Sequence, residues 1–189
     1  RGPQQSEHLG SLTGRAPYYG ANKHRRVGHH GNATLTRLPV DEVENHDVST
    51  NRLERRGVLY TRLRANGGPL HVFNTHLGLN HRQRRRQICR IRKLIAERTR
   101  PEEPVLLAGD FNDWTRRLDG LITEELGLDN AFGGTHCPSL RTWPSRRPVF
   151  NLDRVYVRNL AVHRVERLSG DPWHRLSDHL PLRVELAPA

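Results

Sequence analysis

The chain has 189 residues, of which 34% are hydrophobic and 27% are charged, and its formal net charge is +11 at pH 7. This length suits one domain, and the apolar residues come in dense runs such as Val105 to Ala108, which excludes wholesale disorder. No apolar run approaches the roughly 18 residues of a membrane-spanning helix. We therefore expect one domain over residues 1–189, in the cytoplasm, with no transmembrane segment and no obligate protein partner.

The basic balance indicates a polyanionic partner such as nucleic acid, anionic lipid or a phosphorylated small molecule. An arginine-rich proteome would give the same balance, so charge alone leaves both interpretations open. The two cysteines, Cys89 and Cys137, lack the spacing of a structural zinc site. A disulfide between them stays open, although free thiols in a reducing compartment are the simpler interpretation.

The N-terminal part is polar and predicts few regular elements. A short helix is expected around residues 7–12, and residues 20–31 have the composition of a loop rich in His and Arg. A strand is expected at 33–36, and residues 41–56 are expected to be irregular. The chain also begins at Arg1 and contains no methionine, so we expect a fragment or a processed product.

The central part predicts a β-hairpin followed by a helix. Residues 57–64 and 70–75 have the pattern of strands, and Asn66-Gly67-Gly68 between them is a strong turn signal. Asn80 is a good helix N-cap, and isoleucines follow it at helical spacing. This helix must end before Pro101, because the residue before a proline disfavours helical geometry.

The C-terminal part alternates short strands with a helix, which indicates an α/β or α+β class. The helix is expected at 118–126, with Gly127 as its C-terminal signal. Residues 133–150 are expected to form a loop rich in Gly, Pro and Arg. The remaining expected elements are strands at 105–108, 152–157, 161–167 and 180–186, with a loop at 175–179.

Polar side chains gather at the ends of the expected strands, in four clusters. Strand ends converge on one edge of a layered fold, where ligands bind. Mg²⁺ takes one or two carboxylates together with waters and phosphate oxygens, and His and Asp can transfer protons. The clusters therefore predict a phosphoryl-transfer site that uses a hard metal ion. They are Asn74-Thr75-His76, Gly109-Asp110-Phe111-Asn112-Asp113, Asp153 and Ser177-Asp178-His179.

Four motifs extend these clusters, namely Asn74-Thr75-His76-Leu77, Gly109-Asp110-Phe111-Asn112, Leu152-Asp153-Arg154-Val155 and Ser177-Asp178-His179-Leu180-Pro181. In their order and approximate spacing they resemble the endonuclease/exonuclease/phosphatase superfamily, and the segment from Gly31 to Pro39 resembles it too. That superfamily includes DNase I-like nucleases, neutral sphingomyelinases and inositol-polyphosphate phosphatases. The resemblance implies a bacterial member with an α/β fold, a four-layer sandwich of two packed, mostly antiparallel β-sheets flanked by helices.

The resemblance also implies roles for individual residues in metal-dependent hydrolysis of a phosphoester. Asp110 would orient or deprotonate the attacking water, and Asn112 would donate a hydrogen bond to the phosphate. His76 would donate to a non-bridging oxygen as charge develops on it. His179 would lie beside the phosphate as its acid–base or electrostatic partner, with Asp153 fixing its tautomer. The resemblance leaves the role of general base open between Asp110 and His179.

A divalent cation, Mg²⁺ or Mn²⁺, would polarise the phosphoryl oxygen. The resemblance assigns it to Asp178, Asp110 and Asn112. The substrate would be a phosphoester of nucleic acid, of a phospholipid head group or of a sugar phosphate. Contacts to the substrate are expected from Asn32, Asn74 and Arg175.

One departure from the family pattern concerns the metal site. The family places an Asn at the end of its first strand and a metal-binding Glu at the end of the next, both ahead of the segment that resembles Arg1 to Gly14. We therefore expect the first strands to be missing and the sequence as given to have weak or no activity. The alternative is a truncated relative that binds phosphate or nucleic acid without catalysis.

Several other side chains have two interpretations. Trp114 and Trp143 could stack on a base or cover the edge of the core. The segment Glu54-Arg55-Arg56-Gly57 could place an arginine near phosphate, or it could be a solvated charge run. The basic helix from Arg82 to Lys93 is expected to be a solvated amphipathic face. His24, His29 and His30 match no zinc pattern.

Overall fold

The computed structural model describes residues 5–24, 28–133 and 140–189 of the chain. Its elements, in chain order, are α1 (Gln5–Thr13), β1 (Ala16–His24), β2 (His29–Thr36), β3 (Val40–Asp47), β4 (Gly57–Ala65), β5 (Gly68–His76), α2 (His81–Arg98), β6 (Val105–Asp110), α3 (Leu118–Leu126), β7 (Asp129–Asn130), β8 (Asp153–Arg158), β9 (Leu160–Arg167), α4 (Trp173–Leu176) and β10 (Leu182–Pro188).

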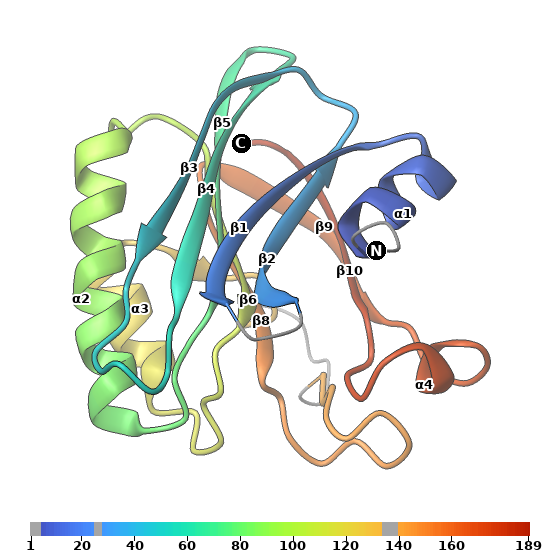
Figure 1. Ribbon diagram of the computed structural model, residues 1–189. Coiled ribbons are helices and arrows are strands. Elements are labelled where there is room, and N and C mark those ends of the chain that lie inside the picture. The colour runs from blue at the N-terminus through green and yellow to red at the C-terminus, as the bar shows by residue number, and fades with distance from the viewer. Residues whose placement is uncertain (1–4, 25–27, 134–139) are drawn as a thin grey trace.

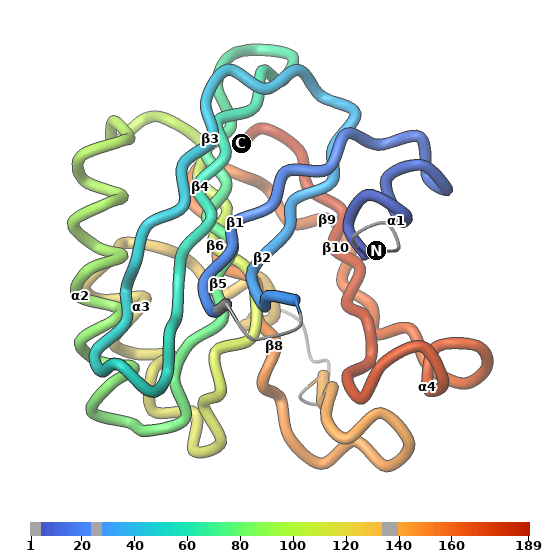
Figure 2. The backbone as a smooth tube through the Cα atoms, in the orientation of Figure 1, coloured from blue at the N-terminus to red at the C-terminus, as the bar shows by residue number. Residues whose placement is uncertain are grey.

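Figure 1 shows these elements in four layers. Helices α2 and α3 cover one face of a six-stranded sheet, and the hairpins β1–β2 and β9–β10 lie on its other side. Helix α1 lies outside the hairpins, and the backbone trace in Figure 2 shows the same arrangement. The four-layer α/β sandwich is therefore confirmed, and one of its two β layers consists of two separate two-stranded sheets.

The six-stranded sheet has the strand order β3-β4-β5-β6-β8-β7. β5 and β6 are parallel, whereas the other neighbouring strands are antiparallel. A parallel pair needs a long crossover connection, and α2 supplies it. The predicted cap of this helix is present, because the Asn80 side chain accepts a hydrogen bond from the backbone N–H of Arg82. The helix ends at Arg98, ahead of Pro101 as expected.

The main core lies between this sheet and the two helices that cover it. Ile88, Ile91 and Ile95 form the apolar stripe of α2 and belong to the same buried cluster as Phe73 of β5 and Leu107 of β6. Most of β4 is buried, because the hairpin β1–β2 packs on the face of the sheet that the helices leave open. A strand covered on both faces needs no polar alternation.

The loop prediction for residues 20–31 was wrong at both ends, and residues 25–27 lie outside the described part of the chain. Residues 16–24 and 29–36 form the antiparallel pair β1–β2, in which Gly20 pairs with Asn32 and Ala21 with Gly31. A Cβ on Gly31 would lie 1.9 Å from the carbonyl oxygen of Gly20. Glycines that suggest a loop in the sequence therefore allow the two strands to approach closely.

The irregular chain predicted for 41–56 was wrong in its first half, which is the edge strand β3. Alternate residues of β3 are half-buried, and these include Glu42 and Glu44. Both carboxylates pair with Arg98 at the end of α2. The strand was hidden in the sequence because charged or polar residues occupy most of its inward face, and Val40 is the one apolar residue there.

Smaller details complete the description. The expected loop at 175–179 begins within the short helix α4 (Trp173–Leu176), which takes up its first two residues, and the last strand covers Leu182–Pro188. Cys89 is an exposed free thiol on α2, and Cys137 lies outside the described residues. Among the described helices, none combines the length and the apolar character needed to cross a membrane.

A buried ionic cluster holds the chain that follows β6. The Asp113 carboxylate is buried, with Arg154 at 3.2 Å and Arg84 at 3.8 Å. It also accepts a hydrogen bond from the backbone N–H of Leu118, at the start of α3. Asp113 therefore joins α2, α3 and β8, although its place in the sequence puts it within the predicted site cluster.

We predict that Asp113→Ala destabilises the protein by about 3–5 kcal/mol, because it leaves two buried guanidinium groups without their counter-charge. Urea denaturation of both proteins measures the difference. The control is Asp41→Ala, which breaks a surface ion pair with Arg64 and should cost less than about 1 kcal/mol. Equal effects of the two substitutions would contradict a structural role for Asp113.

Candidate functional site

Three of the predicted site residues lie side by side across adjacent strand ends. His76 is the last residue of β5, Asp110 is the last residue of β6, and Asp153 is the first residue of β8. In the parallel pairing of β5 with β6, His76 is opposite Asp110. In the antiparallel pairing of β6 with β8, Asp110 is opposite Asp153. The sheet register alone therefore places these three side chains in one row.

Gly109 makes this register possible. Its φ is +140°, and a Cβ at this position would lie 1.9 Å from the carbonyl oxygen of Thr75 on the neighbouring strand. Any other residue would have to push β5 and β6 apart or leave this backbone conformation. The glycine before Asp110 is thus a requirement of strand pairing, and it brings Asp110 beside His76.

The His76 and Asp110 side chains approach each other closely, with 3.2 Å between Nε2 and Oδ2. The pKa of Asp110 is raised to about 6, mainly by burial and to a smaller degree by the charge of Asp153. The hydrogen bond from the Asn112 N–H acts in the opposite direction and lowers this pKa. Burial, and then the positive charge of Arg56, lower the pKa of His76 to about 4. At neutral pH the pair is therefore a carboxylate beside a neutral imidazole.

His179 joins the row from a distant part of the sequence. Its Nδ1 lies 2.6 Å from Asp153 Oδ2, and this hydrogen bond is the largest contribution that raises the pKa of His179. Buried Leu180 follows it, and its N–H donates to the carbonyl of Thr142. This anchor ties the segment after α4 to the segment before β8. The hydrogen bond to Asp153 leaves Nε2 as the ring nitrogen that can meet a substrate.

Asn112 links the ends of β5 and β6. It is buried and has a φ of +48°, and its backbone N–H donates to Asp110 Oδ1 at 2.8 Å. Its side-chain Nδ2 donates to the carbonyl of Leu77 at 2.9 Å. One hydrogen of the amide is thus used internally, and the second hydrogen and the amide oxygen are the groups that could reach a ligand.

Asn32 and Asn74 tie the hairpin β1–β2 to the six-stranded sheet. Asn32 Nδ2 donates to the carbonyls of Gly57 and Asn74, at 2.8 and 3.1 Å. Asn74 Nδ2 donates to the carbonyl of Ala33 at 2.8 Å. Asn32 also lines a hollow that includes His76. Both residues therefore lie near the row, and their hydrogen bonds join two layers of the fold.

Asp178 and Arg175 are not drawn into the row. Both are exposed, and Arg175 Nε pairs with Asp171 at 3.0 Å. Asp178 accepts a hydrogen bond from the Ser177 hydroxyl, and its charge helps to raise the pKa of His179. No hydrogen bond or ion pair within the described ranges connects either residue to Asp110.

A divalent cation can be tested against the chemistry of these donors. Asp110 and Asp153 are neighbouring carboxylates, and the charge of Asp153 disfavours ionisation of Asp110. A cation would relieve this repulsion, and one or two carboxylates are the protein share of a Mg²⁺ site. The donors fit such an ion, although no group of three or more His, Cys, Asp or Glu side chains in the described part of the chain converges on one point.

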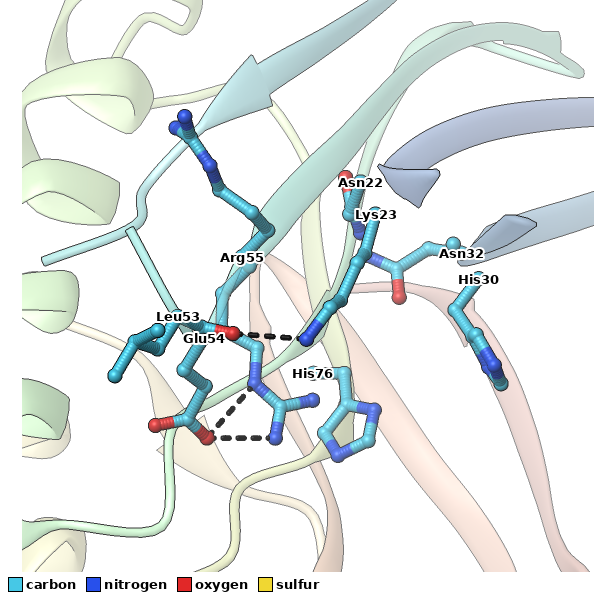
Figure 3. A pocket seen from close by; sticks show the side chains of 10 residues that line it. Asn22, Lys23, His30, Asn32, Leu53, Glu54, Arg55 and His76 are labelled. Atoms are coloured by element: carbon cyan, nitrogen blue, oxygen red, sulfur yellow. Dashed lines mark hydrogen bonds and ion pairs between the residues drawn. The ribbon is translucent and has the colours of Figure 1, made fainter. Parts of the chain in front are cut away.

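The hollow beside His76 brings in Lys23, which the sequence did not single out, and the arginines of the 54–57 run, for which the sequence left two interpretations open. Its volume is roughly 240 Å³, and Figure 3 shows the side chains of Lys23 and Arg55 around it. Arg56 also lines it, and its charge acts on both His76 and Asp110. The only sequence signal was the Arg55-Arg56-Gly57 run before a strand, and nothing marked Lys23.

Three aromatic rings cluster near the same end of the sheet. Trp114 lies edge-on to Trp143 and to Phe150, with ring centroids 5.3 and 4.9 Å apart. Trp114 retains an exposed fraction of 37%. The rings mainly cover one another, which favours the structural interpretation of both tryptophans.

These features define a class of protein. A four-layer α/β sandwich with an acidic, imidazole and amide row at its strand ends is the architecture of DNase I-like proteins. The chain belongs to the endonuclease/exonuclease/phosphatase family, whose model matches residues 2–179. Enzymes of this family hydrolyse phosphoester bonds.

Individual proteins show the same relationship. The uncharacterized protein YbhP of Escherichia coli K12 is 41% identical over 171 residues, which cover 89% of this chain and 67% of YbhP. The endonuclease/exonuclease/phosphatase of Beutenbergia cavernae matches with a TM-score of 0.81 at 19% identity, over 100% of this chain and 59% of that chain. A mannosyl-6-phosphatase of Bacteroides thetaiotaomicron matches with a TM-score of 0.76 at 17% identity, over 97% of this chain and 81% of that chain.

We predict that Gly109→Ala destabilises the protein by at least about 2 kcal/mol, because a Cβ cannot fit against Thr75. Urea denaturation measures this effect. Gly67→Ala is the matched control, since Gly67 also has a positive φ but has no atom within 4 Å of an added Cβ. A loss of stability no larger than that of the control would show that close packing at Gly109 is unimportant.

We further predict that Asp153→Asn lowers the pKa of His179, because it removes the carboxylate that stabilises the protonated ring. NMR titration of the His179 ring in metal-free protein measures the change. Asp171→Asn, which alters an exposed carboxylate next to His174 and Arg175, should leave this titration as it is. An unchanged pKa in Asp153→Asn would rule out the hydrogen bond as its main cause.

Proposed function

We propose that this chain forms one domain that hydrolyses a phosphoester by attack of water on phosphorus. The observation that carries the proposal is the row His76–Asp110–Asp153, completed by the 2.6 Å contact between Asp153 and His179. Membership of the family supports hydrolysis of a phosphoester. The row supplies what that reaction needs, namely a group that accepts a proton and groups that stabilise charge on the phosphoryl oxygens.

Asp110 is proposed to orient the attacking water and to accept its proton. Its carboxylate is held from one side by the Asn112 N–H and lies beside His76. A carboxylate with a pKa raised to about 6 is still ionised at neutral pH, and is a stronger base than an ordinary one. A neutral His76 has a single N–H, which faces the Asp110 carboxylate from Nε2. It is proposed to donate to a non-bridging phosphoryl oxygen once this N–H turns from Asp110 to the bound phosphate, and Asn112 can donate from its second amide hydrogen.

His179 is proposed to stabilise charge on the phosphate and to protonate the leaving oxygen. Its Nδ1 is committed to Asp153, so the ring meets the substrate through Nε2. The Asp153 carboxylate favours the protonated ring, which suits an acid better than a base. The proton taken from water by Asp110 and the proton given by His179 together balance the hydrolysis.

Mg²⁺ or Mn²⁺ is the proposed cofactor. Asp110, Asn112 and Asp178 are the residues proposed to hold it, and Asp153 is a further oxygen donor in the row. When bound, such an ion polarises the phosphoryl oxygen and stabilises the leaving oxygen. Nucleic acid, phospholipid head groups and sugar phosphates are the proposed substrate classes, and Asn32, Asn74 and Arg175 are proposed substrate contacts.

The test is hydrolysis of bis-p-nitrophenyl phosphate with Mg²⁺ or Mn²⁺. We expect Asp110→Asn and His179→Gln each to lower kcat by roughly 10²–10⁴-fold, because each removes a proton-transfer group. A chelator should abolish the activity, and added metal should restore it. Asp129→Asn, which removes an exposed carboxylate from β7 of the same sheet, is the control and should keep the activity of the parent protein.

Equal turnover by all these proteins would refute the assignment of Asp110 and His179. If the parent protein binds phosphate but shows no turnover with either metal, the non-catalytic binding relative is the better description.

A further inference from the structure

A basic hollow adjoins the row of site residues. It lies between the hairpin β1–β2 and the segment before β4, and His76 forms part of its wall. The hydrolytic roles proposed above use only His76 from this hollow. The other polar groups of its lining are Asn22, Lys23, His30, Asn32, Glu54 and Arg56, together with Arg55.

The walls of the hollow are held firmly by close backbone packing. A Cβ on Gly57 would lie 2.0 Å from the side-chain oxygen of Asn22, so the hairpin lies directly against the start of β4. Buried Asn32 reinforces this contact by donating to the Gly57 carbonyl. The cations that line the hollow are therefore mounted on a rigid frame, which reduces the entropy lost when a ligand binds.

The charges in the hollow are unevenly neutralised. Arg56 is half-buried and donates through Nε and one terminal nitrogen to a single oxygen of Glu54, at 3.2 and 2.8 Å. The Lys23 ammonium donates to the carbonyl of Leu53 at 2.8 Å, which is a neutral acceptor. Lys23 thus keeps its full charge, and Figure 3 shows its Nζ pointing into the space between Leu53 and His76.

The basic surface continues beyond Lys23. A second hollow of roughly 390 Å³ is lined by Asn22, Lys23, Asp47, Arg52 and Arg55, so it shares three residues with the first. Arg55 pairs there with Asp47 at 2.9 Å. Positive charge therefore extends outward from His76 on one side of the site.

We propose that the hollow lined by Lys23 and Arg56 is a subsite for a second phosphate group of the substrate. This inference rests on the proposed function, because the first phosphate is the one attacked beside Asp110. Lys23 determines the specificity, because an ammonium group held at this position increases the affinity for a phosphate dianion and not for a neutral group. The substrate is therefore a compound with two neighbouring phosphates, either a phosphorylated oligonucleotide or a small bisphosphate.

Calorimetric binding to two matched pairs of probes tests the subsite. One pair is a hexose bisphosphate and its hexose monophosphate, and the other is a dinucleotide with and without a terminal phosphate. We expect the parent protein to bind the member with the additional phosphate about tenfold tighter in at least one pair. A preference in the hexose pair assigns the small bisphosphate, and a preference in the dinucleotide pair assigns the oligonucleotide.

Three variants test which residues cause the preference for the additional phosphate. Lys23→Gln should abolish most of it, whereas Lys93→Gln removes an exposed charge from α2 on the opposite face of the sheet and should preserve it. Glu54→Gln removes the carboxylate that neutralises Arg56 while keeping an oxygen acceptor, and should increase the preference. The effects of opposite sign at positions 23 and 54 cannot both come from impaired folding.

The subsite is refuted if the parent protein shows no preference in either pair, or if Lys23→Gln keeps the preference. Hydrolysis of bis-p-nitrophenyl phosphate, which carries a single phosphate, reports separately on the proposed function. Normal hydrolysis without any preference would refute the subsite alone, and a preference without hydrolysis would refute the proposed function alone.

Discussion

The parallel pairing of β5 with β6 is the constraint on which the candidate site depends. It continues to the last residue of both strands only because Gly109 packs its backbone against the Thr75 carbonyl. Once that pairing holds, His76 and Asp110 must be neighbours, and the pairing with β8 brings Asp153 to the other side. Strand pairing, and not the conformation of a loop, brings these three groups together. His179 is added to them by one hydrogen bond, to Asp153.

Asp110 and Asp113 lie three residues apart, but their surroundings give Asp113 a structural role and Asp110 a chemical one. Asp113 is buried with Arg154 and Arg84, and it also binds the first N–H of α3. Asp110 has instead a neutral imidazole and another carboxylate as its neighbours, and its pKa is raised mainly by burial and then by the charge of Asp153. The ionic cluster around Asp113 holds the chain after β6 in place. Asp110 can therefore remain at the sheet edge without an Arg or Lys partner among the described residues.

Regular elements could be predicted from the sequence where local signals and tertiary packing agreed. The helix α3 has the predicted bounds and its Gly127 end, and α2 has its predicted Asn80 cap. The strand predicted at 33–36 is the second half of β2, whereas β1, the start of β2 and the edge strand β3 were missed. Gly20 and Gly31 of the hairpin and Glu42 and Glu44 of β3 gave no strand pattern, and only their contacts with neighbouring strands and with Arg98 make them suitable for a strand.

The sequence by itself determined which residue types follow which strands, because the motifs around His76, Asp110 and Asp153 are local. It also determined the family, since four short motifs in order are specific. Only the tertiary structure decided that Asp178 and Arg175 stay exposed outside the row, while Lys23 and Arg56 line the hollow beside it. Those positions depend on how the hairpin β1–β2 and the segment after α4 pack against the rest of the fold. Such contacts join segments that are distant in the chain, so the sequence of each segment contains no pattern that predicts them.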